Sequence, residues 1–182
     1  RDISEHLRME AQLQHLALYD ELTGLPNRRL FYERLEQALR QQKRYNTGFA
    51  VGIIDLNRFK AVNDVYGHQT GDVLLQQAAA RLQGCLREMD TVARLGGDEF
   101  GLLMTGDPGV SGIEAIAQKI LDAWNQPFSV GDHTLETGLS IGFAQCPRDG
   151  EDATSLTSHA DNAMYAAKRT GEGYRPTLEP TV

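Results

Sequence analysis

Two adjacent carboxylates, Asp98 and Glu99, follow a pair of glycines in the sequence Gly96-Gly97-Asp98-Glu99. The glycines allow the positive φ angles of a tight hairpin turn and let a ligand approach the backbone closely. Carboxylates held side by side repel each other unless a cation or a proton lies between them. Mg²⁺ suits such a pair because it takes oxygen ligands from one or two carboxylates and from substrate phosphates. The alternative is a turn with two solvated acids, since Gly and Asp are common turn residues.

A third carboxylate, Asp55, comes directly after residues 49–54, an apolar run of strand length between polar stretches. Such a run is typical of a fully buried central strand, and α/β folds bind ligands in the crevice where strands leave the sheet. If the hairpin neighbours this strand, its two carboxylates lie close to Asp55. A helix starting around residues 57–60 then offers free amides to a phosphate, with the charge of Lys60 beside them. Neither GxxxxGK[ST] nor GxGxxG is present, which disfavours a P-loop or a Rossmann site.

The spacing of apolar residues and chain breakers predicts the elements that must position these groups. Strands are expected at residues 49–54 and 135–144, and a β-hairpin at residues 91–95 and 100–104 surrounds the two glycines. Helices are expected at residues 2–18, from the cap Asn27 to about Arg44, and at residues 58–66, 71–87, 113–125 and 155–169. The inner stripe of the helix at residues 71–87 consists of Val73, Leu74, Ala78, Leu82 and Leu86. This order predicts an α+β (α/β) fold with a mixed central β-sheet flanked by helices.

Length and composition indicate one globular domain with a short appendage. The 182 residues are 41% hydrophobic and 24% charged, which suits a packed core and argues against wholesale disorder. The net charge of −7 disfavours a broad nucleic-acid-binding face, because an acidic surface repels a phosphate backbone. Cys85 and Cys146 form no CxxC pair, so a disulfide scaffold and a thiolate zinc site are both disfavoured, and a reducing compartment fits. No apolar run approaches the roughly 20 residues of a membrane span.

The first helix has a narrow apolar stripe, Met9, Leu13 and Leu16, that leaves the core uninvolved. It is either a connector from an upstream domain or half of a short coiled coil, with a frayed terminus as the alternative. We therefore assign residues 1–18 to an N-terminal connector helix, residues 19–175 to the globular domain and residues 176–182 to a loose tail. The start at Arg1, without an initiator Met or a signal peptide, suggests excision from a longer protein.

The motifs, taken in order, resemble the GGDEF family of diguanylate cyclases from about Asp20 to Gly171. The resemblance is carried by the segments Asp20-x-Leu22-Thr23-Gly24-Leu25-Pro26-Asn27-Arg28, Asp55-Leu56-Asn57-Arg58-Phe59-Lys60, Asn63-Asp64, Gly67-His68, Gly71-Asp72, Arg94-Leu95-Gly96-Gly97-Asp98-Glu99-Phe100, Ser140-Ile141-Gly142 and Ala160-Asp161 with Met164-Tyr165-x-Ala167-Lys168. It implies a palm-like fold, similar to those of adenylyl cyclases and polymerase palms. The implied reaction condenses two GTP into cyclic di-GMP and releases two pyrophosphates.

The resemblance also implies a catalytic and metal-binding group. The Asp55 carboxylate and the Leu56 carbonyl would hold Mg²⁺, or Mn²⁺ in its place, together with Asp98. Asp98 would also accept the proton of the 3′-hydroxyl, and Glu99 would bind a second metal. In-line attack at the α-phosphorus needs such an activated oxygen and a neutralised leaving pyrophosphate.

Further residues are implied as ligands of GTP. Asn63 and Asp72 would read the guanine edge, with His68 nearby; guanine offers N–H donors that an acid can accept, whereas adenine would leave that acid unpaired. Taken alone, Asn63 and Asp72 are helix caps at expected helix starts, and His68 is a turn residue. The phosphates would be held by the catalytic Lys60, by the amides around Arg58 and Phe59, and by Lys168 at the terminal phosphate. Alone, Lys168 is a solvated cation at a helix end.

The segment Arg87-Glu88-Met89-Asp90 matches the RxxD site through which many members of the family bind their product and are inhibited. Arg suits the recognition of phosphate and the stacking on guanine. The alternative for Arg87 and Asp90 is an i, i+3 surface ion pair at a helix end.

Two positions depart from the pattern of the family. Asn57 stands where Asp is more common, which removes a formal charge near the metal. Glu172 replaces an arginine expected near the γ-phosphate, a role that Arg169 or Arg175 could take over.

These observations predict an active diguanylate cyclase that uses GTP, binds no nucleic acid, and is the output domain of a protein with an upstream sensor. Because each domain has one GTP site and the product joins two GTP, catalysis needs a homodimer. Cyclic di-GMP is expected to inhibit it. The alternatives are a catalytically weak GTP-binding regulatory module and a cyclic di-GMP receptor that acts only through Arg87 and Asp90. We expect the chain in the cytoplasm, free or as part of a membrane-attached sensor.

Overall fold

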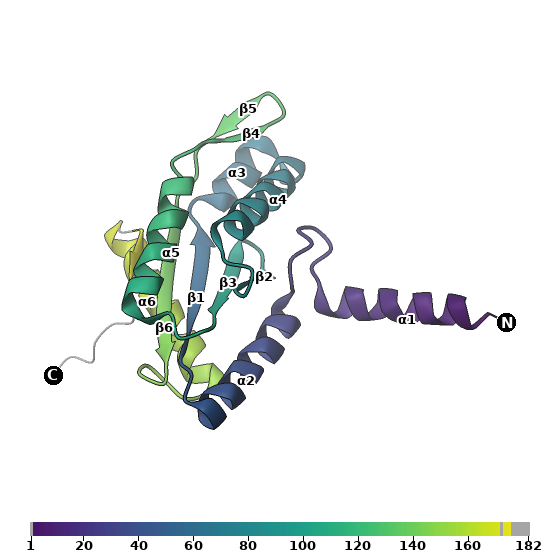
Figure 1. Cartoon of the computed structure of the whole chain (residues 1–182). Coiled ribbons are helices and arrows are strands. Elements are labelled where there is room, and N and C mark those ends of the chain that lie inside the picture. The colour runs from purple at the N-terminus through teal and green to yellow at the C-terminus, as the bar shows by residue number, and fades with distance from the viewer. Residues whose placement is uncertain (1, 172, 176–182) are drawn as a thin grey trace.

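The computed structural model describes residues 2–171 and 173–175, and these form an α+β fold with one main sheet (Figure 1). The sheet has five strands in the order β2-β3-β1-β6-β7, and β4 and β5 form a separate two-stranded sheet. The described elements are α1 (Ile3–Leu18), α2 (Arg28–Tyr45), β1 (Phe49–Leu56), α3 (Phe59–Tyr66), α4 (His68–Cys85), β2 (Thr91–Gly96), β3 (Glu99–Met104), α5 (Gly109–Ala123), β4 (Phe128–Val130), β5 (His133–Leu135), β6 (Leu139–Cys146), α6 (Ala153–Thr170) and β7 (Tyr174–Arg175). The predicted fold class is confirmed.

Strand β1 is the centre of the sheet, as its continuous apolar sequence predicts. It pairs antiparallel with β3 on one side and with β6 on the other. Every residue of β1 is buried except Asp55. The register of these pairs places Asp55 beside Glu99 of β3 and Ser140 of β6.

Helices cover both faces of the sheet, and alternate residues of each strand point to different cores. On one face, Ile54, Leu102 and Phe143 belong to a core with residues of α4 and α5. On the other face, Ile53 and Leu103 belong to a second core with residues of α2 and α6. This alternation follows from the period of two in an extended chain, and it holds the ends of β1 and β3 rigidly.

Helix α4 differs from the prediction in its start and in its inner face. It begins at His68, separated from α3 only by Gly67, whose φ of 91° suits glycine. The prediction that Val73 lies on the inner stripe was wrong, because Val73 is exposed while Leu75 and Ala79 are buried. The buried face is wider than the stripe because α4 packs under both α3 and α5.

The region after α5 also differs from the prediction. The strand expected at residues 135–144 is two strands, because β5 ends at Leu135 and β6 begins at Leu139. The hairpin of β4 and β5 and the two-residue strand β7 were not predicted. Strands this short carry too few residues for a period of two to be visible.

Helix α1 extends away from the sheet (Figure 1), and none of its residues is buried. Its exposed apolar residues include Leu7, Met9, Leu13 and Leu16. The predicted helix and its absence from the core are both confirmed. In the part of the chain that the structure describes, no helix combines the length and the apolar character that crossing a membrane requires.

Gly142 of β6 provides a test of how closely α6 packs on the sheet. A Cβ at this position would collide with the carbonyl oxygen of Ala160, the amide of Met164 and the carbonyl carbon of Ala163, all backbone atoms of α6. We expect Gly142→Ala to lower the free energy of unfolding, measured in urea, by about 3 kcal/mol, because backbone atoms of a packed helix cannot move aside cheaply. The matched control is Gly84→Ala in α4, where nothing lies within 4 Å; it should raise stability by about 0.5–1 kcal/mol. Equal effects of the two substitutions would show that α6 does not restrict the residue at position 142.

Candidate functional site

Three carboxylates meet where β1 leaves the sheet. Asp55 is paired in the ladder with Glu99, and Asp98 stands in the turn between β2 and β3. The amide of Leu56 donates to the carbonyl oxygen of Asp98 at 3.3 Å, which ties the turn to β1. The hairpin therefore neighbours the central strand, which meets the condition under which the sequence places its carboxylates close to Asp55.

The electrostatics of this cluster favour bound protons or cations. Burial, the charge of Asp55 and a hydrogen bond between the two carboxyl groups raise the pKa of Asp98 to about 6. Burial and the charges of Asp161 and Asp55 raise the pKa of Glu99. Burial and Asp55 also raise the pKa of Asp161, a residue of α6. Sequence reasoning found Asp161 in a motif but did not place it at the site; its position seven residues before Lys168, on the same face of α6, was the available signal.

Lys168 lies on the carboxylate of Asp55 rather than in open solvent. Its Nζ donates to Asp55 Oδ2 at 2.7 Å. The hydrogen bond to Asp55 raises the pKa of Lys168. The alternative of a fully solvated cation at a helix end was therefore wrong.

A clasp around Arg94 holds the hairpin turn in place, and sequence reasoning did not find it. Arg94 Nε donates to the carbonyl oxygen of Gly97 at 3.0 Å, and Nη1 donates to Asp20 Oδ1 at 3.1 Å. Asp20 Oδ2 accepts from the hydroxyl of Thr23 at 2.7 Å and from its amide at 2.9 Å. Burial opposes ionisation of Asp20, but the hydrogen bonds from Thr23 and the charge of Arg94 hold its pKa below the usual value. The turn after α1 is thereby joined to the hairpin that carries Asp98.

The N-terminus of α3 has no side-chain cap. Arg58, the N-cap residue, adopts a left-handed conformation with φ of 61°, and it makes no side-chain hydrogen bond to the helix. Arg58 and Lys60 are exposed, and Phe59 is partly buried. Amides at an uncapped helix start and two nearby cations can receive an anion.

The helix-cap interpretation of Asn63 and Asp72 was wrong, because both residues lie inside helices. Asn63 is in α3, and its buried Oδ1 has no hydrogen-bond partner among the described residues. A Cβ on Gly71 would collide with this oxygen, so the glycine makes room for it. Asp72 is exposed in the second turn of α4, and His68 is the exposed first residue of that helix rather than a turn residue. The buried Oδ1 of Asn63 is thus an unpartnered acceptor, and such a group in a native structure calls for an explanation.

The side chain of Asn57 accepts a hydrogen bond from β6. Its Oδ1 accepts from Ser140 Oγ at 3.1 Å. The backbone amide of Asn57 donates to the carbonyl oxygen of Gly138 at 2.8 Å.

Arg87 and Asp90 form an i, i+3 ion pair, which was the sequence-based alternative to a product-binding site. Arg87 Nη2 lies 2.8 Å from Asp90 Oδ1, and Nε donates to Oδ2 at 3.0 Å. Nη2 also donates to the carbonyl oxygen of Thr105 at 3.1 Å. The hydrogen bond with Asp90 raises the pKa of Arg87. Arg87 remains 44% exposed whereas the side chain of Asp90 is inaccessible, so a ligand would meet the guanidinium first.

Two sequence-based expectations concern parts of the chain beyond the described residues. These are the role of Glu172 and the loose tail at residues 176–182. Arg169, which could take over the role of the missing arginine, is exposed at the end of α6.

The oxygen atoms near the hairpin are of the kind that bind a divalent metal ion. Within residues 2–171 and 173–175, no group of three His, Cys, Asp or Glu side chains is arranged to hold a metal by itself. The carboxyl group of Asp55 lies close enough to that of Asp98 to raise its pKa, and the Leu56 carbonyl follows Asp55 in the chain. Two carboxylates and one carbonyl fit Mg²⁺, whose remaining ligands are commonly phosphate and water oxygens.

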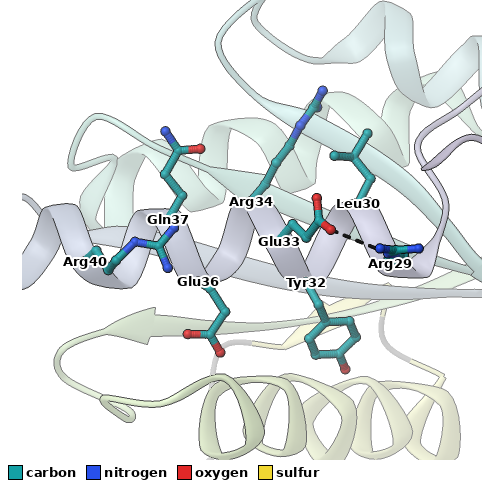
Figure 2. Close-up of a pocket in the computed structure, with 8 residues that line it drawn as sticks. All are labelled: Arg29, Leu30, Tyr32, Glu33, Arg34, Glu36, Gln37 and Arg40. Atoms are coloured by element: carbon teal, nitrogen blue, oxygen red, sulfur yellow. Dashed lines mark ion pairs between the residues drawn. The ribbon is translucent and has the colours of Figure 1, made fainter. Parts of the chain in front are cut away.

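A hollow of about 680 Å³ lies elsewhere, along the outer side of α2 (Figure 2). All of its lining residues belong to that one helix, and Arg29 pairs there with Glu33 at 3.5 Å. It contains none of the carboxylates at the hairpin and is not part of the candidate site.

The sequence pattern described as "Diguanylate cyclase, GGDEF domain" matches residues 17–174. The "Signaling protein YkoW" of Bacillus subtilis is 42% identical over 177 residues, which is 96% of this chain and 22% of YkoW. The "Bifunctional diguanylate cyclase/cyclic di-GMP phosphodiesterase MucR" of Pseudomonas aeruginosa is 45% identical over 168 residues, or 92% of this chain and 24% of MucR. The chain thus spans about a quarter of the length of these relatives.

Two solved structures share the fold over nearly their whole length. The crystal structure of the GGDEF domain of TpbB from Pseudomonas aeruginosa superposes with a TM-score of 0.83 at 41% identity, covering 87% of this chain and 99% of that one. The coiled coil and GGDEF domain of DgcB from Caulobacter crescentus, solved in complex with c-di-GMP, gives a TM-score of 0.83 at 26% identity, covering 97% and 93%.

The raised pKa of Asp98 predicts that this site costs stability in the absence of metal. Between about pH 4 and pH 6 the folded chain binds more protons than the unfolded chain, so stability falls as pH rises through this range. We expect Asp98→Asn, with a chelator present, to raise the free energy of unfolding at pH 7.5 by about 1 kcal/mol, a value reduced for solvent screening. The gain should shrink as pH falls through 6 toward 4, because the wild-type carboxyl becomes protonated in the folded state and the repulsion is lost. A gain that is independent of pH would show that repulsion at Asp98 is not its cause.

Proposed function

We propose that this chain, which belongs to the GGDEF family of diguanylate cyclase domains, condenses two GTP into cyclic di-GMP with release of two pyrophosphates. The observation that carries the proposal is the convergence of Asp55, Asp98 and Glu99 at the end of β1. The uncapped start of α3 follows that strand after two residues, and the ammonium of Lys168 lies beside Asp55. Carboxylates, amides and cations thus occur together, as a metal-bound triphosphate requires.

The carboxylates would bind a divalent metal ion, as diguanylate cyclases of this family generally do, and we propose Mg²⁺ or, in its place, Mn²⁺. Asp55, Asp98 and the Leu56 carbonyl would hold it, and Glu99 would contribute to a second ion. When bound, the metal neutralises triphosphate charge and lowers the pKa of the attacking hydroxyl. The carboxylate of Asp98, beside the proposed metal, would accept the 3′-hydroxyl proton.

Base specificity would come from α3 and α4. The unpartnered Oδ1 of Asn63 and the exposed carboxylate of Asp72 are both acceptors, and guanine presents N1–H and N2–H₂ donors on one edge. His68, the exposed first residue of α4, would add a further polar contact. Adenine would leave an acceptor unpaired in this arrangement, which disfavours it.

The phosphates would lie between α3 and α6. The amides of Phe59 and Lys60 at the uncapped helix start would donate to a phosphate, and the side chains of Arg58 and Lys60 would add positive charge. Lys168 would reach the terminal phosphate from α6. Lys60 also qualifies as a catalytic group, since it can neutralise charge on the leaving pyrophosphate.

The reaction would require two copies of the domain, because one candidate GTP site per chain cannot join two GTP. Helix α1 presents Met9, Leu13 and Leu16 to solvent on one narrow stripe, which fits a parallel two-stranded coiled coil. In this arrangement α1 would connect the domain to an upstream sensor, and the full protein would respond to its signal.

The first test is the incubation of the purified chain with GTP and Mg²⁺, followed by identification of the nucleotide product. Wild type should form cyclic di-GMP, and Asp98→Ala should lose it, because a metal ligand and the proposed base are removed together. The matched control is Asp132→Ala, an exposed acid between β4 and β5, which should keep wild-type activity. An Asp98→Ala rate above about one tenth of wild type, a barrier change below ~1.4 kcal/mol, would exclude Asp98 from the mechanism. GTP binding without product in the wild type would instead support a catalytically weak regulatory module.

The proposed dimer predicts that specific activity depends on protein concentration. Activity per chain should rise with concentration until α1 is paired, and Leu13→Glu should shift this rise to higher concentration by burying charge in the helix contact. Leu7→Glu changes an equally exposed leucine on the opposite side of α1 and should behave like wild type. Flat specific activity in a dilution series, with sedimentation showing a monomer, would contradict the proposal.

Product inhibition would act through Arg87 and Asp90. Because the pair is closed with Arg87 exposed, cyclic di-GMP would have to take the guanidinium from Asp90. Calorimetry should therefore show weaker cyclic di-GMP binding to Arg87→Ala and unchanged binding to Glu88→Ala, the matched change between the two residues. Product yield should increase in Arg87→Ala at unchanged initial rate, since an inhibitory site contributes no transition-state binding. Unchanged product affinity would leave the segment as a structural ion pair.

A further inference from the structure

We infer that Lys168 is the resident counter-cation of the acidic site: it holds Asp55 while no metal is bound, and it must leave Asp55 for a divalent ion to bind. Metal binding and triphosphate binding are then coupled through the position of one ammonium group. This inference rests on the proposed function, in which Lys168 contacts the terminal phosphate. It adds that Lys168 contacts Asp55 before metal and nucleotide bind.

The geometry of the pair carries the inference. Lys168 Nζ lies 2.7 Å from Asp55 Oδ2, and the two residues are 113 positions apart in the chain. The carboxylate of Asp55 is 15% exposed, whereas the side chain of Lys168 is 42% exposed. Asp55 is therefore held by its strand, and Lys168, on a long flexible stem in the last turn of α6, is the partner that can move.

The surroundings explain why a cation is needed there. Asp98, Glu99 and Asp161 all interact electrostatically with Asp55. Arg28 offsets the charge of Glu99, and Lys168 offsets those of Asp55 and Asp98. The guanidinium of Arg94 is engaged with Asp20 and with the turn carbonyl. Lys168 thus supplies positive charge at the carboxylate that a divalent ion would use.

An ammonium group and a divalent ion would compete for that carboxylate. Both need the oxygens of Asp55, and their like charges disfavour simultaneous occupancy at hydrogen-bond distance. Part of the free energy of metal binding is then spent on displacing Lys168. The displaced ammonium finds a new partner only when a triphosphate is present. Each ligand therefore favours the other, and this coupling is reciprocal by thermodynamic linkage.

Replacing Lys168 distinguishes a counter-cation of Asp55 from a residue that only contacts phosphate. A residue that only contacts phosphate would leave the affinity for metal alone unchanged when it is replaced. A resident counter-cation would raise that affinity when it is removed, because the metal no longer has to displace it. In a chelator, the same substitution should lower stability, because the carboxylates lose their cation.

The experiment is a titration with Mn²⁺ in the absence of nucleotide, followed by electron paramagnetic resonance of the free ion. We expect Lys168→Gln to lower the Kd for Mn²⁺ by about threefold or more, since a competing charge-assisted contact is removed. Lys168→Arg, which keeps the cation, should retain the wild-type Kd within about twofold. Arg169→Gln removes one charge from the same helix turn without touching Asp55 and controls for general electrostatics.

A second measurement tests the coupling. With a non-hydrolysable GTP analogue present, the analogue should tighten Mn²⁺ binding less in Lys168→Gln than in wild type. Melting curves in chelator should show a lower Tm for Lys168→Gln, and saturating Mn²⁺ should restore it to within a few degrees of wild type. An Mn²⁺ Kd that is unchanged or raised in Lys168→Gln, with circular dichroism showing a folded chain, would overturn the inference.

Failure of the proposed function has a different signature. If Asp55→Asn and Asp98→Asn leave Mn²⁺ binding unchanged, the proposed metal site is wrong, and the inference falls with it. If those variants lose Mn²⁺ binding and Lys168→Gln does not tighten it, the metal site stands and the counter-cation role is excluded. None of these readings requires turnover of GTP.

Discussion

Repulsion among carboxylates at one end of β1 is the constraint around which this fold is arranged. The β1 ladder sets Asp55 beside Glu99, and the turn adds Asp98 within hydrogen-bond reach of Asp55. Such a grouping is unfavourable unless other parts of the chain hold it together. Two cores on opposite faces of the sheet provide that hold, with Lys168 offsetting the charge of Asp55. The raised pKa values are therefore a stability cost located where a divalent ion would be used.

Under the proposed function, the elements around the cluster each contribute a different part of the nucleotide site. Helices α3 and α4 are separated by one glycine, and they carry the buried, unpartnered Oδ1 of Asn63 and the exposed polar groups of α4. Helix α6 crosses the sheet closely enough that only glycine fits at position 142, and so it delivers Lys168 and Asp161 to the end of β1. Preorganisation of this kind lowers the reorganisation needed when charge develops in a transition state.

The clasp of Asp20 and Arg94 places the cluster in contact with the start of the domain. Arg94 joins the turn carbonyl of Gly97 to the acid that follows α1, and Thr23 holds that acid in place. A change in the direction of α1 would therefore act on the backbone of the hairpin turn. Under the proposed function, this provides a physical connection between a helix that leaves the domain and the site of chemistry.

The sequence by itself determined most of the local structure, because helices of fifteen or more residues carry clear hydrophobic periods and the buried strand β1 is a continuous apolar run. It also determined that Gly96 and Gly97 turn between two strands, but only the pairing of β1 with β3 decided that Asp98 and Glu99 stand beside Asp55. Tertiary structure alone decided which partners these groups have. The pairing of Lys168 with Asp55 and of Arg94 with Asp20 joins residues far apart in the chain, and no local pattern encodes such contacts. The strands β4, β5 and β7 likewise depend on neighbours, because two or three residues form a strand only where a partner edge supplies the hydrogen bonds.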